Sequence, residues 1–167
     1  MQSFKEKLVT KILTRYPFLA DLVASKLKIE KSDNLQLAFM NKKLRDSSVA
    51  LVTTAGVHLK KDAPFDMKIK EGDVSFRIIP DWAEKKDLTI SHNHYDHTDA
   101  DKDINIVFPL EILKDFARKG LIGKVAPRHF GFMGSIYDTV KLVNGPAREV
   151  AELLKEDGVD IALLSPA

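Results

Sequence analysis

The stretch from Ser91 to Asp103 concentrates the side chains of this sequence that can transfer protons or bind metals. It runs Ser-His-Asn-His-Tyr-Asp-His-Thr-Asp-Ala-Asp-Lys-Asp. An imidazole titrates near neutral pH, and a nearby carboxylate can orient it, so we expect a catalytic or binding site between His92 and Asp101. A structural interpretation is also open, because Asp and Asn side chains cap helices and turns.

The spacing His92-x-His94-x-Asp96-His97 matches the metal-binding signature of the metallo-β-lactamase superfamily. Imidazole and carboxylate ligands suit zinc or iron, so a metal-dependent hydrolase with ligands at His92, His94 and His97 is one alternative. That fold also needs ligands well downstream, and His129 is the only histidine that follows the motif. We therefore favour proton transfer over metal binding for this cluster.

A second cluster spans residues 126–134, Ala-Pro-Arg-His-Phe-Gly-Phe-Met-Gly. Arg128 could grip a ligand carboxylate with two parallel hydrogen bonds, and His129 could transfer a proton. Gly131 and Gly134 would let the backbone approach a ligand closely. The alternative is an aromatic loop that packs on the core, with Arg128 in a structural ion pair.

Short apolar runs alternate with helical patterns along most of the chain. We expect strands over residues 49–54, 76–80, 88–91, 122–126 and 159–164, and helices over 3–15, 19–27, 109–119, from 135 onward, and over 146–156. This alternation predicts an α/β fold with a mainly parallel sheet flanked by helices. The expected organisation is an N-terminal helical lead-in over residues 1–46 and an α/β domain over 47–167. Ligands of such sheets bind beyond the carboxyl ends of the strands.

The composition excludes several classes of function. Lys and Arg (26) nearly balance Asp and Glu (24), and this balance gives no electrostatic case for nucleic-acid binding. With no cysteine, the chain has no disulfide, zinc–thiolate site or thiol nucleophile of its own. No apolar run approaches the roughly 18 residues of a membrane-spanning helix, and no signal peptide is evident. We therefore expect a cytoplasmic protein without nucleic-acid or membrane partners.

Several motifs, in order along residues 48–167, resemble selenoprotein B of the glycine, sarcosine, betaine and D-proline reductase family. They are Leu51-Val52-Thr53-Thr54-Ala55-Gly56-Val57-His58-Leu59, Pro64-Phe65-Asp66, residues 72–80, residues 90–97, residues 105–110, residues 126–134 and residues 154–160. The first 45 residues contribute little to this resemblance.

The resemblance implies the substrate-binding component of an enzyme that cleaves C–N bonds reductively. A small amino acid or amine would be the substrate, and a partner subunit with a pyruvoyl group would activate its nitrogen. We expect His94, Asp96, His97, Arg128 and His129 to line the pocket, with His58 at its rim. Arg128 would hold the substrate carboxylate, and a histidine would protonate the departing amine.

The resemblance also places the nucleophile, a selenocysteine or a cysteine in its place, just beyond residue 167. No residue of this chain can fill that role, so the chain alone is expected to be inactive. We expect it to be the front portion of a longer protein, with a UGA codon after Ala167. A non-catalytic binding or assembly subunit is the remaining alternative.

Overall fold

The computed structural model describes residues 12, 15–16, 18 and 38–167. It comprises two compact units, which are Met1–Asn41 with Asn93–Asp96, and Lys42–His92 with His97–Ala167. The helices predicted over 3–15 and 19–27 lie outside the described residues, apart from a few single positions. None of the described helices is long and apolar enough to span a membrane.

The second unit contains all the strands and helices that position the candidate site. The strands are β1 (Ser48–Thr53), β2 (Val57–Leu59), β3 (Phe76–Pro80), β4 (Leu88–Ile90), β5 (Lys124–Val125), β6 (Arg128–Phe132) and β7 (Ile161–Ser165). The α-helices are α3 (Thr98–Lys102), α4 (Leu110–Arg118), α5 (Thr139–Asn144) and α6 (Pro146–Glu156), and the 3-10 turns are η1 (Leu44–Asp46), η2 (Lys85–Asp87) and η3 (Ile104–Ile106).

Five of the strands form one sheet built around β1. β7 pairs with β1 in parallel, from Val49 opposite Ile161 to Thr53 opposite Ser165. β5 and β6 pair in parallel with β1 as well, and β3 adds to β6 in the antiparallel direction. Since β7 occupies one edge of β1, β5 and β6 follow one another along the other edge. The predicted mainly parallel sheet is confirmed, with β3 as an antiparallel exception.

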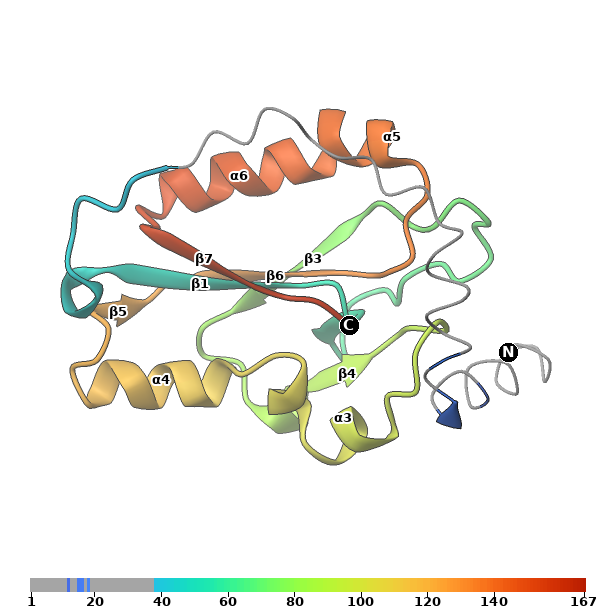
Figure 1. Cartoon of the computed structure of the whole chain (residues 1–167), viewed down its shortest axis with the longest axis horizontal. Helices are drawn as coiled ribbons and strands as arrows, with labels where there is room; N and C mark the ends of the chain where they lie inside the picture. The colour runs from blue at the N-terminus through green and yellow to red at the C-terminus, as the bar shows by residue number, and fades with distance from the viewer. Residues whose placement is uncertain (1–11, 13–14, 17, 19–37) are drawn as a thin grey trace. The chain divides into compact units, whose positions relative to one another are not determined.

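Helices cover both faces of this sheet, with α5 and α6 on one side and α4 on the other (Figure 1). On the α6 side, Val150 packs with Phe130 and Phe132 of β6 in a buried cluster. On the α4 side, Leu110 and Leu113 are buried. The strand β1 between these layers is buried at five of its six positions, which explains its apolar, β-branched sequence.

Two helices end as their sequences predict. Gly120 follows α4 with φ of +67°, and Gly158 follows α6 with φ of +63°. Both glycines adopt the left-handed conformation that terminates a helix and that other residues adopt only with strain. Pro146 stands in the first turn of α6, where its missing N–H costs no helical hydrogen bond.

A small second sheet, β2 paired antiparallel with β4, joins the main sheet through Gly56. The Gly56 N–H donates to the Phe132 carbonyl at 2.8 Å, and its own carbonyl accepts from the Ser91 N–H at 2.9 Å. Gly56 has φ of +71°, and a β-carbon there would collide with the Ser91 carbonyl. This link sets the end of β4 beside the carboxyl end of β6.

The structure adds two strands that the sequence did not predict as strands. The sequence predicted no strand at β2. β6 occupies part of the segment that the sequence predicted as a ligand-binding cluster. The strands expected over 49–54, 76–80, 88–91 and 159–164 are present as β1, β3, β4 and β7.

Candidate functional site

The carboxyl ends of the parallel strands meet at one edge of the main sheet. The Thr54 N–H, just after β1, donates to the Ser165 carbonyl at 3.2 Å, and the Ala167 N–H donates to Oγ1 of Thr54 at 3.2 Å. This is the edge at which α/β proteins bind ligands.

His92 lies at this edge and is only 4% exposed. Its Nε2 accepts a hydrogen bond of 3.0 Å from the Gly134 N–H. A β-carbon on Gly134 would lie 3.0 Å from that nitrogen and 3.6 Å from the Thr54 carbonyl oxygen. Because Nε2 accepts a backbone proton, a neutral His92 carries its own proton on Nδ1.

His58 is an internal residue of the small sheet, 3% exposed, and does not lie at an open rim. Its Nδ1 lies 2.8 Å from the Leu59 carbonyl oxygen, and its Nε2 lies 2.8 Å from Oγ of Ser91. A carbonyl can only accept, so Nδ1 holds the proton and a neutral Nε2 accepts from the Ser91 hydroxyl. Ser91 was not among the predicted site residues, and its position beside His92 in the sequence was the available signal.

His97 pairs with Asp101 one helical turn along α3. The His97 Nδ1 and an Asp101 carboxylate oxygen are 2.8 Å apart, and both side chains are partly exposed. The carboxylate orients the imidazole in the way that a proton-transfer residue requires.

His94 and Asp96 belong to the other compact unit, with Asn93 and Tyr95. Both side chains are exposed. Their predicted catalytic roles stay predictions.

Arg128 stands at the start of β6, at the opposite end of that strand from Gly134. Its guanidinium makes a bidentate ion pair with Asp157, at 2.7 Å from Nε and 2.8 Å from an Nη, and contacts Glu156 at 3.2 Å. The hydrogen bond with Asp157 raises the pKa of Arg128 above its ordinary value. Arg128 thus has an internal carboxylate partner, and its role in holding a substrate carboxylate stays a prediction.

His129 is fully buried between β1 and the α4 side of the sheet. Its Nδ1 accepts from the Leu51 N–H at 2.9 Å, and Phe108 packs edge-on against its ring. Burial, followed by the nearby charge of Lys114, lowers the pKa of His129 to about 4. A neutral histidine without solvent access suits a structural role better than the predicted proton transfer.

The sequence also suggested a metal centre as an alternative. Among the described residues, no three His, Asp or Glu side chains are arranged to hold a metal ion.

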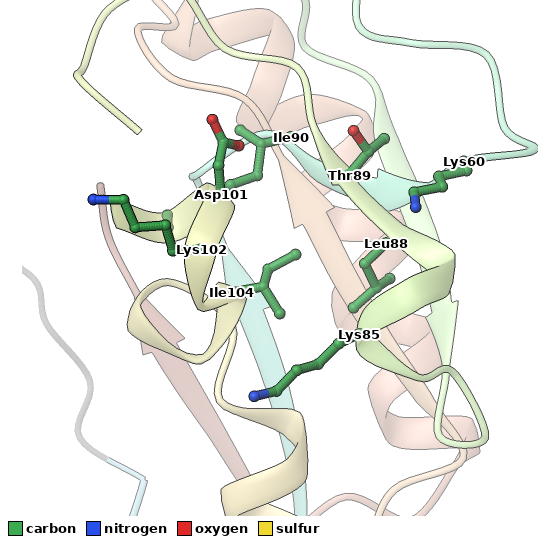
Figure 2. Close-up of a pocket in the computed structure, with 9 residues that line it drawn as sticks. Lys60, Lys85, Leu88, Thr89, Ile90, Asp101, Lys102 and Ile104 are labelled. Carbon is green, nitrogen blue, oxygen red and sulfur yellow. The ribbon is translucent and has the colours of Figure 1, made fainter. Parts of the chain in front are cut away.

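A pocket of about 250 Å3 lies next to the His97–Asp101 pair, between β4 and α3. Its lining residues are Lys60, Lys85, Leu88, Thr89, Ile90, Ala100, Asp101, Lys102 and Ile104. In Figure 2, Asp101 stands beside Ile90 on one side, and Lys60 stands with Thr89 on the other.

Two of the lysines that line this pocket already pair with carboxylates, and one has no such partner among the described residues. Lys85 pairs with Asp103 and Glu111, at 3.1 and 3.3 Å, and Lys102 pairs with Asp99 at 2.8 Å. Within the described part of the chain, the Lys60 ammonium and the Thr89 hydroxyl have no side-chain partner. These two groups are therefore the ones most available to an anionic group of a ligand.

Comparison with known proteins gives a consistent set of relatives. D-proline reductase subunit gamma of Acetoanaerobium sticklandii is 44% identical over 126 residues, which cover 75% of this chain and 51% of that protein. The beta subunit of betaine reductase complex component B from Peptoclostridium acidaminophilum is 29% identical over 84% of this chain and 32% of its own length. The gamma subunit of glycine reductase complex component B from Symbiobacterium thermophilum is 30% identical over 74% of this chain and 29% of its own length.

The chain therefore spans about half the length of one of these relatives and about a third of the others. No solved structure matches it. The family model for glycine/sarcosine/betaine reductase selenoprotein B (GRDB) matches residues 7–167. This match begins well before residue 48, so the N-terminal segment is part of the family likeness, contrary to the expectation from the motifs. The chain belongs to the glycine/sarcosine/betaine reductase selenoprotein B family.

Proposed function

We propose that this chain is the substrate-binding component of a reductase that cleaves the C–N bond of a small amino acid or its N-methylated derivative. The observation that supports this most is the family match, which extends over residues 7–167. The names of the relatives supply the substrate class: D-proline, glycine, betaine and sarcosine.

In the proposed reaction, a selenolate or thiolate attacks the substrate carbon that bears nitrogen. A C–Se or C–S bond forms, the C–N bond breaks with its electron pair going to nitrogen, and a proton passes to the departing amine. The nucleophile would follow position 167, which the hydrogen bond from the Ala167 N–H to Thr54 holds at the carboxyl edge of the sheet. A pyruvoyl-containing partner would activate the substrate nitrogen.

We further propose that the pocket between β4 and α3 receives the substrate. An amino acid carries a carboxylate and a positively charged nitrogen. Lys60 and Thr89 offer a cation and a hydrogen-bond donor for the carboxylate, and Asp101 offers a negative charge for the nitrogen. Leu88 and Ile104 would contact the apolar part of the substrate. His97 is hydrogen-bonded to Asp101, which lines this pocket, so His97 is the histidine that this proposal places beside the substrate.

Isothermal titration of the purified chain with D-proline, glycine, sarcosine and betaine tests this proposal. We expect at least one of the four to bind, and acetate, which lacks the charged nitrogen, to bind more weakly. Lys60→Gln and Asp101→Asn should each weaken binding about tenfold, which corresponds to about 1.4 kcal/mol. Lys61→Gln, on the residue next to Lys60, is the matched control and should change binding by less than about twofold.

The outcomes separate the function from the location of the site. If none of the four compounds binds, the substrate-binding role is wrong and an assembly role is favoured. If a compound binds but Lys60→Gln and Asp101→Asn leave its affinity unchanged, the role stands and the pocket is elsewhere.

A further inference from the structure

The strand β7 forms an open edge of the main sheet. One side of β7 pairs with β1 over five residues. In the described part of the chain, no strand pairs with its other side. Alternate backbone N–H and C=O groups of β7 therefore point away from the sheet, where another strand can pair with them.

The side chains of β7 are unusually exposed for a strand in a parallel sheet. Leu163 is 43% exposed and Leu164 is 69% exposed. The neighbouring β1, to which they are paired through Leu51 and Val52, is buried at nearly every position. Strands of parallel sheets are normally buried on both faces, so β7 has the sequence of an internal strand in the position of an edge strand.

The two exposed leucines point to opposite faces of the sheet because they are adjacent in the strand. The Leu164 partner Val52 packs toward the cluster that contains Val150 of α6, so Leu164 lies on the α6 face. Leu163 lies on the α4 face. Covering both leucines requires polypeptide on both faces, which a single added strand does not provide.

The helices on the two faces also expose apolar side chains. On α5, Val140 is 70% exposed and Val143 is 61% exposed. On α4, Ile112 is 46% exposed and Phe116 is 41% exposed. Figure 1 shows β7 running between α6 on one side and α4 on the other. Exposed apolar surface on this scale marks interaction sites in soluble proteins.

We propose that the β7 edge is an interface for the half of a D-proline reductase gamma-type subunit that this chain does not match. That half would add a strand to β7 and cover Leu163 and Leu164 with further α/β structure. The chain spans 51% of that relative, so the relative contains about as much polypeptide again, enough to cover both faces. Consecutive α/β units of one subunit join their strands into a common sheet, which favours this occupant over an unrelated protein.

The test uses this chain with the unmatched half of the Acetoanaerobium sticklandii subunit made as a separate polypeptide. We expect a complex of one copy of each by native mass spectrometry, and slower hydrogen exchange of the β7 amides that point away from β1 in the complex than in the chain alone. Leu164→Asp should weaken binding at least tenfold. The matched control is Leu121→Asp, which should change binding by less than twofold. Leu121 follows α4 in the sequence and is 51% exposed.

Four results would overturn the proposal. They are no complex, a complex that Leu164→Asp leaves intact, outward-pointing β7 amides already protected in the chain alone, and a homodimer that Leu164→Asp dissociates. The third result would mean that residues of this chain cover the edge, and the fourth that a second copy does. The proposal depends on the family membership and not on the substrate pocket, so substrate titrations neither support nor weaken it.

Discussion

The Gly134 N–H donates a hydrogen bond of 3.0 Å to Nε2 of His92, although 42 positions separate the two residues. This contact holds the first histidine of the His-rich stretch against the end of β6. It anchors His92, which the sequence suggested only as a metal ligand, at the carboxyl edge of the sheet.

Replacing His92 with alanine should destabilise the protein. The Gly134 N–H would lose its acceptor and a cavity would form at a site that is 4% exposed, so we expect the free energy of unfolding to fall by about 1–3 kcal/mol. Urea denaturation measures this change. His94→Ala, at an exposed position, is the control and should cost less than about 0.5 kcal/mol. Equal effects of the two substitutions would contradict the structural role of His92.

Stability should fall as the pH drops from about 6.5 to about 4, because of His129. Its pKa is about 4 in the folded protein and about 6.5 in the unfolded chain, so the unfolded chain binds the extra proton in this window. Over the whole range from pH 6.5 to pH 4, the free energy of unfolding should fall by about 3 kcal/mol, because each unit of pKa shift corresponds to about 1.36 kcal/mol. Denaturation at a series of pH values should show a shallower dependence for His129→Gln than for the unchanged protein. Parallel curves for the two proteins would show that His129 does not titrate in this way.

The ion pair between Arg128 and Asp157 should matter for stability more than for ligand binding. Asp157→Asn removes the charge of a carboxylate that is 11% exposed, so we expect a loss of about 1–2 kcal/mol in the free energy of unfolding. Glu156→Gln is the matched control, since Glu156 is 65% exposed, and should cost less than about 0.5 kcal/mol. Arg128→Lys should leave the affinity for amino acids within twofold. A large loss of affinity would restore the predicted role of Arg128 in holding a substrate carboxylate.

Purified protein should contain much less than one equivalent of zinc or iron. We expect this because no three suitable ligands lie together among the described residues. Elemental analysis checks this. About one equivalent of metal that disappears in His92→Ala or His94→Ala would instead favour the hydrolase interpretation.

Most of the main sheet could be predicted from local pattern. Local conformational preferences predicted three features that the structure confirms. They are the strand β1, the helix Pro146–Glu156 and the glycines that end α4 and α6. β6 could not be predicted in this way. Its sequence Arg-His-Phe-Gly-Phe combines groups that are typical of a ligand site, and only the pairing with β1 and β3 makes it a strand.

The candidate site could be predicted less well, because it depends on contacts between distant segments. The composition around Arg128 indicates a carboxylate partner, but it does not distinguish a ligand from Asp157, which is 29 positions away. Likewise, nothing local to Lys60 or Thr89 indicates that they line a common pocket with Asp101. The density of His and Asp predicted a site between His92 and Asp101, and this stays a prediction.

Gly131 can help to recognise distant relatives of this protein. The sequence suggested that this glycine lets a ligand approach the backbone, but the structure gives it a different neighbour. A β-carbon at Gly131 would collide with the Val57 carbonyl, and one at Gly134 would press on His92. Gly131 therefore leaves room for the crossing of β2 over β6, and Gly134 leaves room for the His92 ring. A homologue that has lost its histidines but keeps both glycines should retain this crossing, whereas one with a side chain at the first position must have rebuilt it. The glycine pair can therefore trace the architecture through evolution after the chemistry has changed.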